Sequence, residues 1–329
     1  MKKILNDPNQ VVKDMLAGLV AAHGGVLKQL PGTTVVAKKE SPVKGKVGLV
    51  SGGGSGHEPA HAGYIGKGML DAAVCGEVFT SPTPDQVQEA IKAVDGGAGV
   101  LLIVKNYSGD VMNFDMAAEL AKMEEIEVEQ VIVNDDVAIE DPASRRGIAG
   151  TVFVHKIAGA KAESGASLAE VKATAEKAIQ NLRSMGMALS ACTIPAAGKP
   201  GFTIASDEME LGMGIHGEPG IETLPLSPAD AIADQLLAPI LKEGIYEEGD
   251  EVALMINGLG STPLMEQYIL AGNVLDRLKS RKLNVCRTFV GDYMTAIDMA
   301  GVSVTLLKLD EELKELLLAP SDAQHFTIQ

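Results

Sequence analysis

Apolar and polar positions follow two patterns that alternate along this chain. Short runs rich in β-branched residues are typical of buried strands, and longer windows with apolar residues every three to four positions are typical of helices that cover a sheet. Alternation of the two patterns predicts an α/β fold. We expect two α/β domains, each with a mixed or mostly parallel sheet flanked by helices.

The first half contains a regular succession of such elements. Strands are predicted at 46–50, 72–75, 100–105 and 128–133, and helices at 9–23, 85–94, 111–123 and 168–183. Pro8 suits the first turn of the first helix, and two glycines at 24–25 end that helix.

A second αβ set begins near residue 187. Strands are predicted at 189–194, 252–256, 285–290 and 302–309, and helices at 229–242, 264–281 and 311–318. Ser184, Met185 and Gly186 read as the end of a helix, so the boundary is expected at 184–188. The predicted domains are therefore 1–185 and 186–329.

Composition is that of a globular protein with enough apolar material for more than one core. The chain has 329 residues, of which 46% are hydrophobic and 22% charged, and it has no tryptophan. With 28 basic and 44 acidic residues the net charge is −16, which repels nucleic-acid phosphates and anionic membranes. We therefore expect no direct nucleic-acid partner and no membrane partner.

The cysteines and the first residues indicate a cytoplasmic protein. Cys75, Cys192 and Cys286 are odd in number and widely spaced, which fits neither a disulfide framework nor a CxxC metal site. Asp7 and Pro8 interrupt the basic start before a signal-peptide core forms. The longest apolar stretches are far too short to span a membrane.

Three loops that follow predicted strands of the first half are candidates for chemistry. They are SGGGSGHE at 51–58, GEVFTS at 76–81 and KNYSGD at 105–110. Ligands of open α/β sheets bind outside the carboxyl ends of strands, so such loops can converge on one site. Glycine-rich turns can also simply reverse the chain, but three of them in one half favour a site.

Two familiar motifs are excluded by their context, and a third is absent from the sequence. HEPAH at 57–61 fits the zinc string HExxH, but Pro59 leaves His57 outside any helix and destroys the i, i+4 geometry. GMGIHG at 212–217 fits GxGxxG, yet the proline-rich segment after it forms no helix for a pyrophosphate. No GxxxxGK[ST] phosphate loop exists. We expect no metal site and no nucleotide cradle of this chain's own.

His216 is the most unusual of the six histidines. Glycines flank it on a proline-rich loop, where a ligand can approach the imidazole closely. Glycine beside histidine also occurs in plain turns, so this feature alone leaves both interpretations open.

Five motifs together are much more specific than any one of them. They are GGGSGHEP at 52–59, GEVFTSPTPDQV at 76–87, KNYSGDVMNF at 105–114, IPAAGKPGF at 194–202 and GIHGEPGIE at 214–222. With them, the chain resembles the dihydroxyacetone-binding K subunits of the bacterial dihydroxyacetone kinases. The similarity extends over nearly the whole chain.

The resemblance implies a role for particular residues. In that family the histidine at the position of His216 forms a hemiaminal with the substrate's carbonyl carbon through Nε2. Asp110 is expected to hydrogen-bond and activate the substrate hydroxyl, with His57 as its acid/base neighbour. The residues expected to surround the triose are Gly54, Ser55, Gly56, His57, Lys105 and Asp110.

The resemblance also implies partners. The family fold is two α/β domains in a homodimer. Phosphate comes from a separate L subunit that carries ADP and Mg and is recharged by a phosphoprotein of the sugar phosphotransferase system. Single-chain relatives use ATP and append a nucleotide domain, and none is expected here.

The expected chemistry agrees with elementary physical reasoning. Dihydroxyacetone is so small that hydrogen bonds alone would also admit glycerol and other polyols. A neutral imidazole that attacks the ketone adds a bond that glycerol cannot form, which supplies retention and selection. A carboxylate at Asp110 is a suitable base for the hydroxyl.

Two departures from the family pattern keep a second function open. The segment 141–144 is shorter than usual and lacks a Tyr-Thr pair, and the tail at 319–326 lacks the usual Thr-Pro-Ala. Some bacteria carry a paralogue that binds dihydroxyacetone and acts as a transcriptional co-activator. The intact site motifs favour the kinase subunit over this sensor, and over a purely structural α/β protein.

Overall fold

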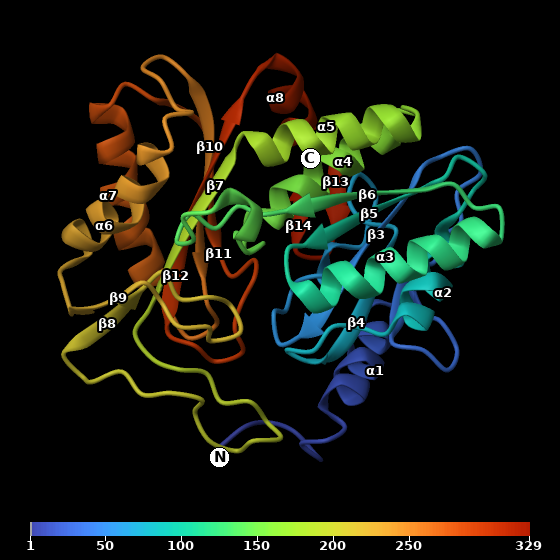
Figure 1. Ribbon diagram of the computed structural model, residues 1–329, viewed down its shortest axis with the longest axis horizontal. Coiled ribbons are helices and arrows are strands. Elements are labelled where there is room, and N and C mark those ends of the chain that lie inside the picture. Colours follow the sequence, from blue (N-terminus) through green and yellow to red (C-terminus); the bar gives the residue numbers. More distant parts are fainter. Residues whose placement is uncertain (1) are drawn as a thin grey trace. The chain divides into compact units, whose positions relative to one another are not determined.

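The computed structural model describes residues 2–329 and consists of two compact units (Figure 1). One unit contains the chain up to residue 133, with 152–178 and 313–329, and the other contains 134–151 and 179–312. Each unit has its own six-stranded sheet. The predicted class of two α/β domains is confirmed.

The units are not the continuous halves 1–185 and 186–329 that the sequence predicts. The chain enters the second unit at 134–151 and returns to the first unit at 152–178. It then builds the rest of the second unit at 179–312 and is in the first unit again at 313–329. Residues 184–186 do not end a helix, because they lie inside strand β7 (Leu182–Ala188). Pairing with β12 (Gly301–Leu309) supplies the backbone hydrogen bonds of β7, and the local sequence does not reveal this pairing.

The sheet of the first unit is mostly parallel. Its strands are β1 (Leu27–Gln29), β2 (Val35–Lys38), β3 (Gly48–Ser55), β4 (Ala72–Val78), β5 (Val100–Lys105) and β6 (Val128–Val133). They lie in the order β1-β2-β4-β3-β5-β6, with β3 to β6 parallel. The chain leaves β3 toward β4 and leaves β5 toward β6, so the order reverses between β3 and β5. Ligands of such sheets bind at this point.

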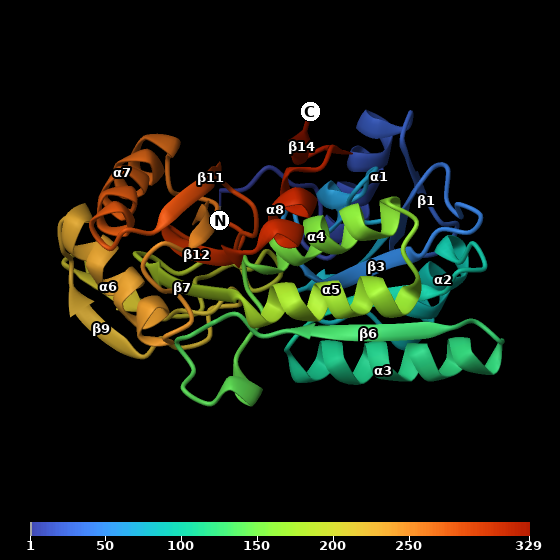
Figure 2. The same cartoon turned by 90° about the horizontal axis from the view of Figure 1, so that it is seen from above.

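Helices cover both faces of that sheet. The helices of the first unit are α1 (Val11–His23), α2 (Pro84–Val94), α3 (Ser108–Met123), α4 (Thr151–Glu163) and α5 (Leu168–Gln180). Figure 2 shows α3 on one side of β6, with α4 and α5 on the other. The sequence did not predict α4, because residues 151–160 are all buried and a helix buried all round has no polar face to reveal its period.

The C-terminal segment also packs on the first unit. After helix α8 (Glu311–Leu318), a hairpin forms from β13 (Ser321–Ala323) and β14 (Phe326–Ile328). It contacts the segment around the short helix η1 (Ala62–Tyr64), where the ring of Tyr64 meets that of Phe326 edge-on at 6.5 Å.

The sheet of the second unit is mixed and mostly antiparallel. Besides β7 and β12, its strands are β8 (Glu208–Leu211), β9 (Glu222–Pro225), β10 (Glu251–Gly258) and β11 (Asn284–Gly291). The order is β11-β10-β12-β7-β8-β9, and only β10 and β11 are parallel among the described strands of this sheet. Helices α6 (Ala229–Lys242) and α7 (Leu264–Ser280) share an apolar core with it. Residues 189–194, predicted as a strand, form none.

Within residues 2–329, no helix is both long enough and apolar enough to cross a membrane.

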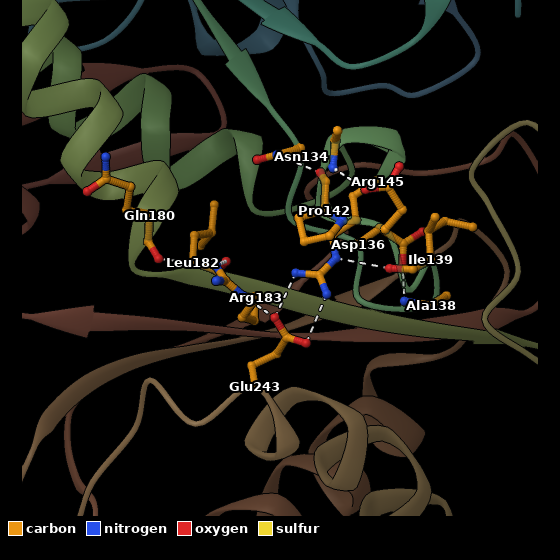
Figure 3. A network of polar contacts seen from close by, with 12 residues as sticks. Asn134, Asp136, Ala138, Ile139, Pro142, Arg145, Gln180, Leu182, Arg183 and Glu243 are labelled. Atoms are coloured by element: carbon orange, nitrogen blue, oxygen red, sulfur yellow. Dashed lines mark hydrogen bonds and ion pairs between the residues drawn. The ribbon is translucent and has the colours of Figure 1, made fainter.

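A partly buried ion-pair network ties three parts of the second unit together (Figure 3). Glu243, at the end of α6, accepts hydrogen bonds from Arg145 Nη1 at 2.7 Å and Nη2 at 2.9 Å, and from Arg183 Nε of β7 at 3.0 Å. The side chain of Arg145 is only 6% exposed. Hydrogen bonds from these two arginines hold the pKa of Glu243 below its usual value despite partial burial.

Removing this charge should destabilise the second unit. We expect Glu243→Gln to lower the free energy of unfolding by about 1.5–3 kcal/mol, since charge-assisted hydrogen bonds to two arginines are weakened. Because the pKa of Glu243 is lower in the folded state, its contribution is present above about pH 4.5 and disappears as the pH falls through the folded value.

Urea unfolding at pH 7 and at acid pH measures both effects. Glu248→Gln, which weakens an exposed pair with Lys282, is the matched control and should cost less than about 1 kcal/mol. A wild-type-like midpoint for Glu243→Gln would contradict the importance of the network.

Candidate functional site

The first two candidate loops are joined at the ends of β3 and β4. Ser55 Oγ donates a hydrogen bond to the Gly76 carbonyl oxygen at 2.7 Å, and Phe79 N–H donates to the Ser55 carbonyl oxygen at 2.9 Å. At position 54 a Cβ atom would lie 2.5 Å from the backbone nitrogen of Thr80, so only glycine permits this approach. The loop after β4 thus packs directly against the glycine-rich end of β3.

His57 lies within this joined region. Its side chain is fully buried and its ring stacks on Phe79, with centroids 5.1 Å apart and 19° between the planes. Next to it, the Glu58 carboxylate accepts a hydrogen bond from the Gly56 N–H at 3.1 Å. The Gly56 N–H and the Ser55 hydroxyl hydrogen are therefore both used in holding the loop.

The zinc-type string at 57–61 forms no helix. The two histidines therefore do not share a helical face, which agrees with the prediction made from Pro59. Among residues 2–329, no group of three histidine, cysteine or acidic side chains is arranged to hold a metal ion.

The third loop brings two buried charged residues to the end of β3. Lys105 ends β5 with 0% exposure, and Asp110 lies in the first turn of α3 with 2% exposure. A Cβ atom on Gly53 would lie 3.1 Å from Lys105 Nζ and 3.3 Å from Asp110 Oδ2. The charged ends of both side chains thus lie against the bare backbone of Gly53.

His216 lies in the second unit, on the loop between β8 and β9. Its Nδ1 is 2.8 Å from Glu218 Oε1, and its backbone N–H donates to Oε2 at 2.9 Å. Desolvation would raise the pKa of Glu218, but the hydrogen bond and charge of His216 outweigh it and lower that pKa to about 2. An ionised carboxylate can only accept, so Nδ1 carries the proton. In the neutral ring, Nε2 then keeps its lone pair for a ligand.

Arg146 anchors the loop that carries His216. Its Nη2 donates to the Gly212 carbonyl oxygen at 2.8 Å, and its Nε donates to Asp136 Oδ2 at 2.8 Å. Burial raises the pKa of Asp136 to about 6, against the opposing effect of Arg146. A Cβ on Gly214 would lie 2.1 Å from Glu218 Oε2 and 2.6 Å from Arg146 Nη1, so the loop closes tightly over both side chains.

A cavity of about 460 Å³ adjoins His216 within the second unit. Its walls include Cys192, Phe202 and Thr223, and part of the IPAAGKPGF motif. This size is suitable for a small molecule.

The site residues predicted from sequence fall into two groups. Gly54, Ser55, Gly56, His57, Lys105 and Asp110 belong to the first unit, where their loops lie together. His216 belongs to the second unit. Neither Glu218 nor Arg146 is among the site residues predicted from sequence. A carboxylate two residues after a glycine-flanked histidine was the available signal for Glu218.

Comparison with known proteins identifies the family. The Dak1 domain model matches residues 17–325. The chain is 57% identical to the dihydroxyacetone-binding subunit of PTS-dependent dihydroxyacetone kinase 1 of Listeria innocua, over 98% of this chain and 99% of that subunit.

Two solved structures share the fold. The dihydroxyacetone kinase of C. freundii superposes with a TM-score of 0.89 at 39% identity, covering 99% of this chain and 60% of that longer chain. A dihydroxyacetone kinase operon co-activator gives a TM-score of 0.91 at 35% identity, covering 98% of this chain and 99% of that chain. Taken with the family model, these similarities show that the chain belongs to the Dak1 family.

Proposed function

We propose that the chain is the dihydroxyacetone-binding subunit of a kinase that depends on the phosphotransferase system, and that it holds its substrate covalently on His216. The observation that carries this proposal is the contact of His216 Nδ1 with the Glu218 carboxylate at 2.8 Å. It directs the Nε2 lone pair to a ligand, which is what attack on a ketone requires.

The covalent step balances with these two residues. Nε2 forms a bond to the carbonyl carbon, and the carbonyl oxygen gains a proton and becomes a hydroxyl. The electron pair of the C=O π bond moves to that oxygen, which takes its proton from solvent. Nδ1 gives up its proton to the Glu218 carboxylate, which passes it on to solvent, so the protons balance. The product is a hemiaminal, and the sum of the step is addition of an imidazole N–H across the C=O bond.

Residues of the first unit act on the hydroxyl that receives phosphate. The Asp110 carboxylate accepts its proton, His57 is the acid/base neighbour, and the Lys105 ammonium stabilises the negative charge that develops on oxygen. The backbone at 54–56 surrounds the triose without side-chain bulk.

The phosphoryl group comes from a separate subunit in this proposal. That L subunit carries ADP and Mg, is recharged by the phosphotransferase system, and supplies the nucleotide for which this chain has no phosphate-loop motif. The similarity to a dihydroxyacetone-binding subunit from Listeria innocua supports a partner of this kind. We further propose a cytoplasmic homodimer that serves glycerol metabolism.

Carbon NMR with dihydroxyacetone labelled at its ketone carbon tests the covalent step. We expect the carbonyl resonance to be replaced by one of a saturated carbon when wild-type protein is added. His216→Ala should abolish this signal, and Glu218→Gln should weaken it because the tautomer is no longer fixed. Glu222→Gln, an exposed residue of β9, is the control. An unchanged carbonyl resonance at saturating protein would refute the hemiaminal.

A reconstituted assay tests the kinase role against the sensor. Mixed with L subunit and phosphorylated donor protein, the chain should form dihydroxyacetone phosphate steadily. It should form none when Mg-ATP alone replaces these partners. Formation of the hemiaminal without any product, together with capture of a DNA-binding regulator, would favour the co-activator function instead.

Asp110→Asn should separate transfer from binding. The amide keeps the shape of the side chain but loses the base, so we expect turnover to fall by about 10²–10⁴-fold while the hemiaminal still forms. Asp115→Asn makes the same chemical change at an exposed position of the same helix and should leave turnover unchanged. Turnover near the wild-type value would show that Asp110 has a structural role and does not act as the base.

A further inference from the structure

Three buried side chains of the first unit form a cluster next to the residues of the proposed site. Ser51 of β3 and His155 of α4 are 0% exposed, and His61 is 4% exposed. Ser51 Oγ is 3.3 Å from His61 Nδ1 and 3.2 Å from His155 Nε2. The centroids of the two imidazole rings are 5.3 Å apart. None of the chemistry proposed above uses these residues.

The hydrogen bonds of Ser51 fix the tautomers of both histidines. Its hydroxyl donates to the Ile103 carbonyl oxygen at 2.6 Å, and a carbonyl oxygen cannot donate in return. The single hydrogen of the hydroxyl is thereby used. Both ring nitrogens near Ser51 must then donate, which places protons on His61 Nδ1 and His155 Nε2.

The remaining ring nitrogens agree with this assignment. His61 Nε2 and His155 Nδ1 are buried without a hydrogen-bond partner in the described structure. Burying an N–H without a hydrogen-bond acceptor costs more free energy than burying a nitrogen lone pair without a donor. Burial, followed by the charge of Lys105, lowers the pKa of His61 well below 6.5 and that of His155 to about 3. Both rings are therefore neutral.

The cluster lies where two strands of the sheet separate. The parallel ladder between β3 and β5 runs from Gly48 and Val100 to its last pair, Ser51 and Ile103. Beyond that pair, β3 continues beside β4 alone, and β5 continues beside β6. The Ser51 hydroxyl therefore bonds across the ladder at its final rung.

Residues of the proposed site lie just beyond the point where the β3–β5 ladder ends. Gly53 lies two residues beyond Ser51, and Lys105 lies two residues beyond Ile103. Side chains two residues apart on a strand point to the same face of the sheet. The side chain of Lys105 therefore lies on the same face as that of Ile103, next to the cluster. Asp110 also lies against Gly53. Residues 54–57 come from the β3 side of the opening, and Lys105 and Asp110 come from the β5 side.

We infer that Ser51, His61 and His155 are positioning residues that set the width of the opening between β3 and β5. Through it they set the distance between the two halves of the phosphoryl-transfer site in the first unit. The inference rests on the function proposed above for that site. The inference also gives a role to His61, the second histidine of the string HEPAH, whose presence the excluded zinc motif does not explain.

Substitutions that keep or remove one N–H test this inference. An asparagine amide can replace the Nδ1–H of His61, and a glutamine amide can replace the Nε2–H of His155. We expect His61→Leu and His155→Leu to lower kcat by about 10–100-fold, the effect of a misplaced catalytic group. KM for dihydroxyacetone should change much less, because His216 holds the substrate. His61→Asn and His155→Gln should recover most of kcat.

A control on the same helix separates positioning from loss of stability. Lys156 Nζ donates to the Leu316 carbonyl oxygen at 2.7 Å, away from the cluster. Lys156→Met should lower the melting temperature without lowering kcat. If the leucine variants keep kcat, or if the amide variants lose as much as the leucine variants, the inference is wrong.

Two measurements on the isolated chain distinguish failure of this inference from failure of the proposed function. Nitrogen NMR of the imidazoles at pH 7 should show His61 protonated at Nδ1 and His155 at Nε2, both neutral. Hydrogen exchange of residues 52–57 should be faster in the leucine variants than in the amide variants. Other tautomers, a charged ring or equal exchange would overturn the inference, even if the wild-type chain produced no dihydroxyacetone phosphate.

Discussion

The first unit is organised by the burial of an ammonium and a carboxylate at the end of a parallel sheet. Lys105 and Asp110 are almost completely removed from solvent. Taking such ions out of water costs several kcal/mol each unless nearby groups compensate. Compensation requires polar atoms at fixed positions and space free of apolar side chains. The local sequence, with three glycines at 52–54 and a loop that returns from β4, meets both requirements.

The same requirement explains why so many hydrogen bonds at this edge are made within the protein. Ser55 Oγ bonds to Gly76, the Glu58 carboxylate bonds to Gly56, and Phe79 bonds back to Ser55. These bonds support the end of the β3–β4 ladder, where its register becomes irregular. A site that must orient a small substrate gains from this rigidity, since less ordering remains to be done when the substrate binds.

Much of this arrangement could be predicted from sequence because its signals are local. Strand β5 and helices α6 and α8 have the predicted bounds, since apolar runs and breaking residues coincide there. The three loops are also continuous in sequence. Strand β7 was missed because its neighbours in the sheet, and not its own pattern, determine its conformation. The cluster at Ser51 was missed because His155 is 104 residues away along the chain.

The chain fixes the tautomer of a histidine in two ways, and the choice of acceptor decides what each histidine can do. At His216 the acceptor is an ionised carboxylate, which stabilises positive charge on the ring as it develops during attack. The side chain is 19% exposed, so a ligand can reach the ring.

At Ser51 the acceptor is a neutral hydroxyl shared by two buried rings. Among the described residues, no carboxylate is hydrogen-bonded to either ring, and the charge of Lys105 opposes a positive charge on both. These imidazoles are therefore suited to hold structure and unsuited to react. The charge of the group that accepts the ring proton thus gives these histidines opposite roles.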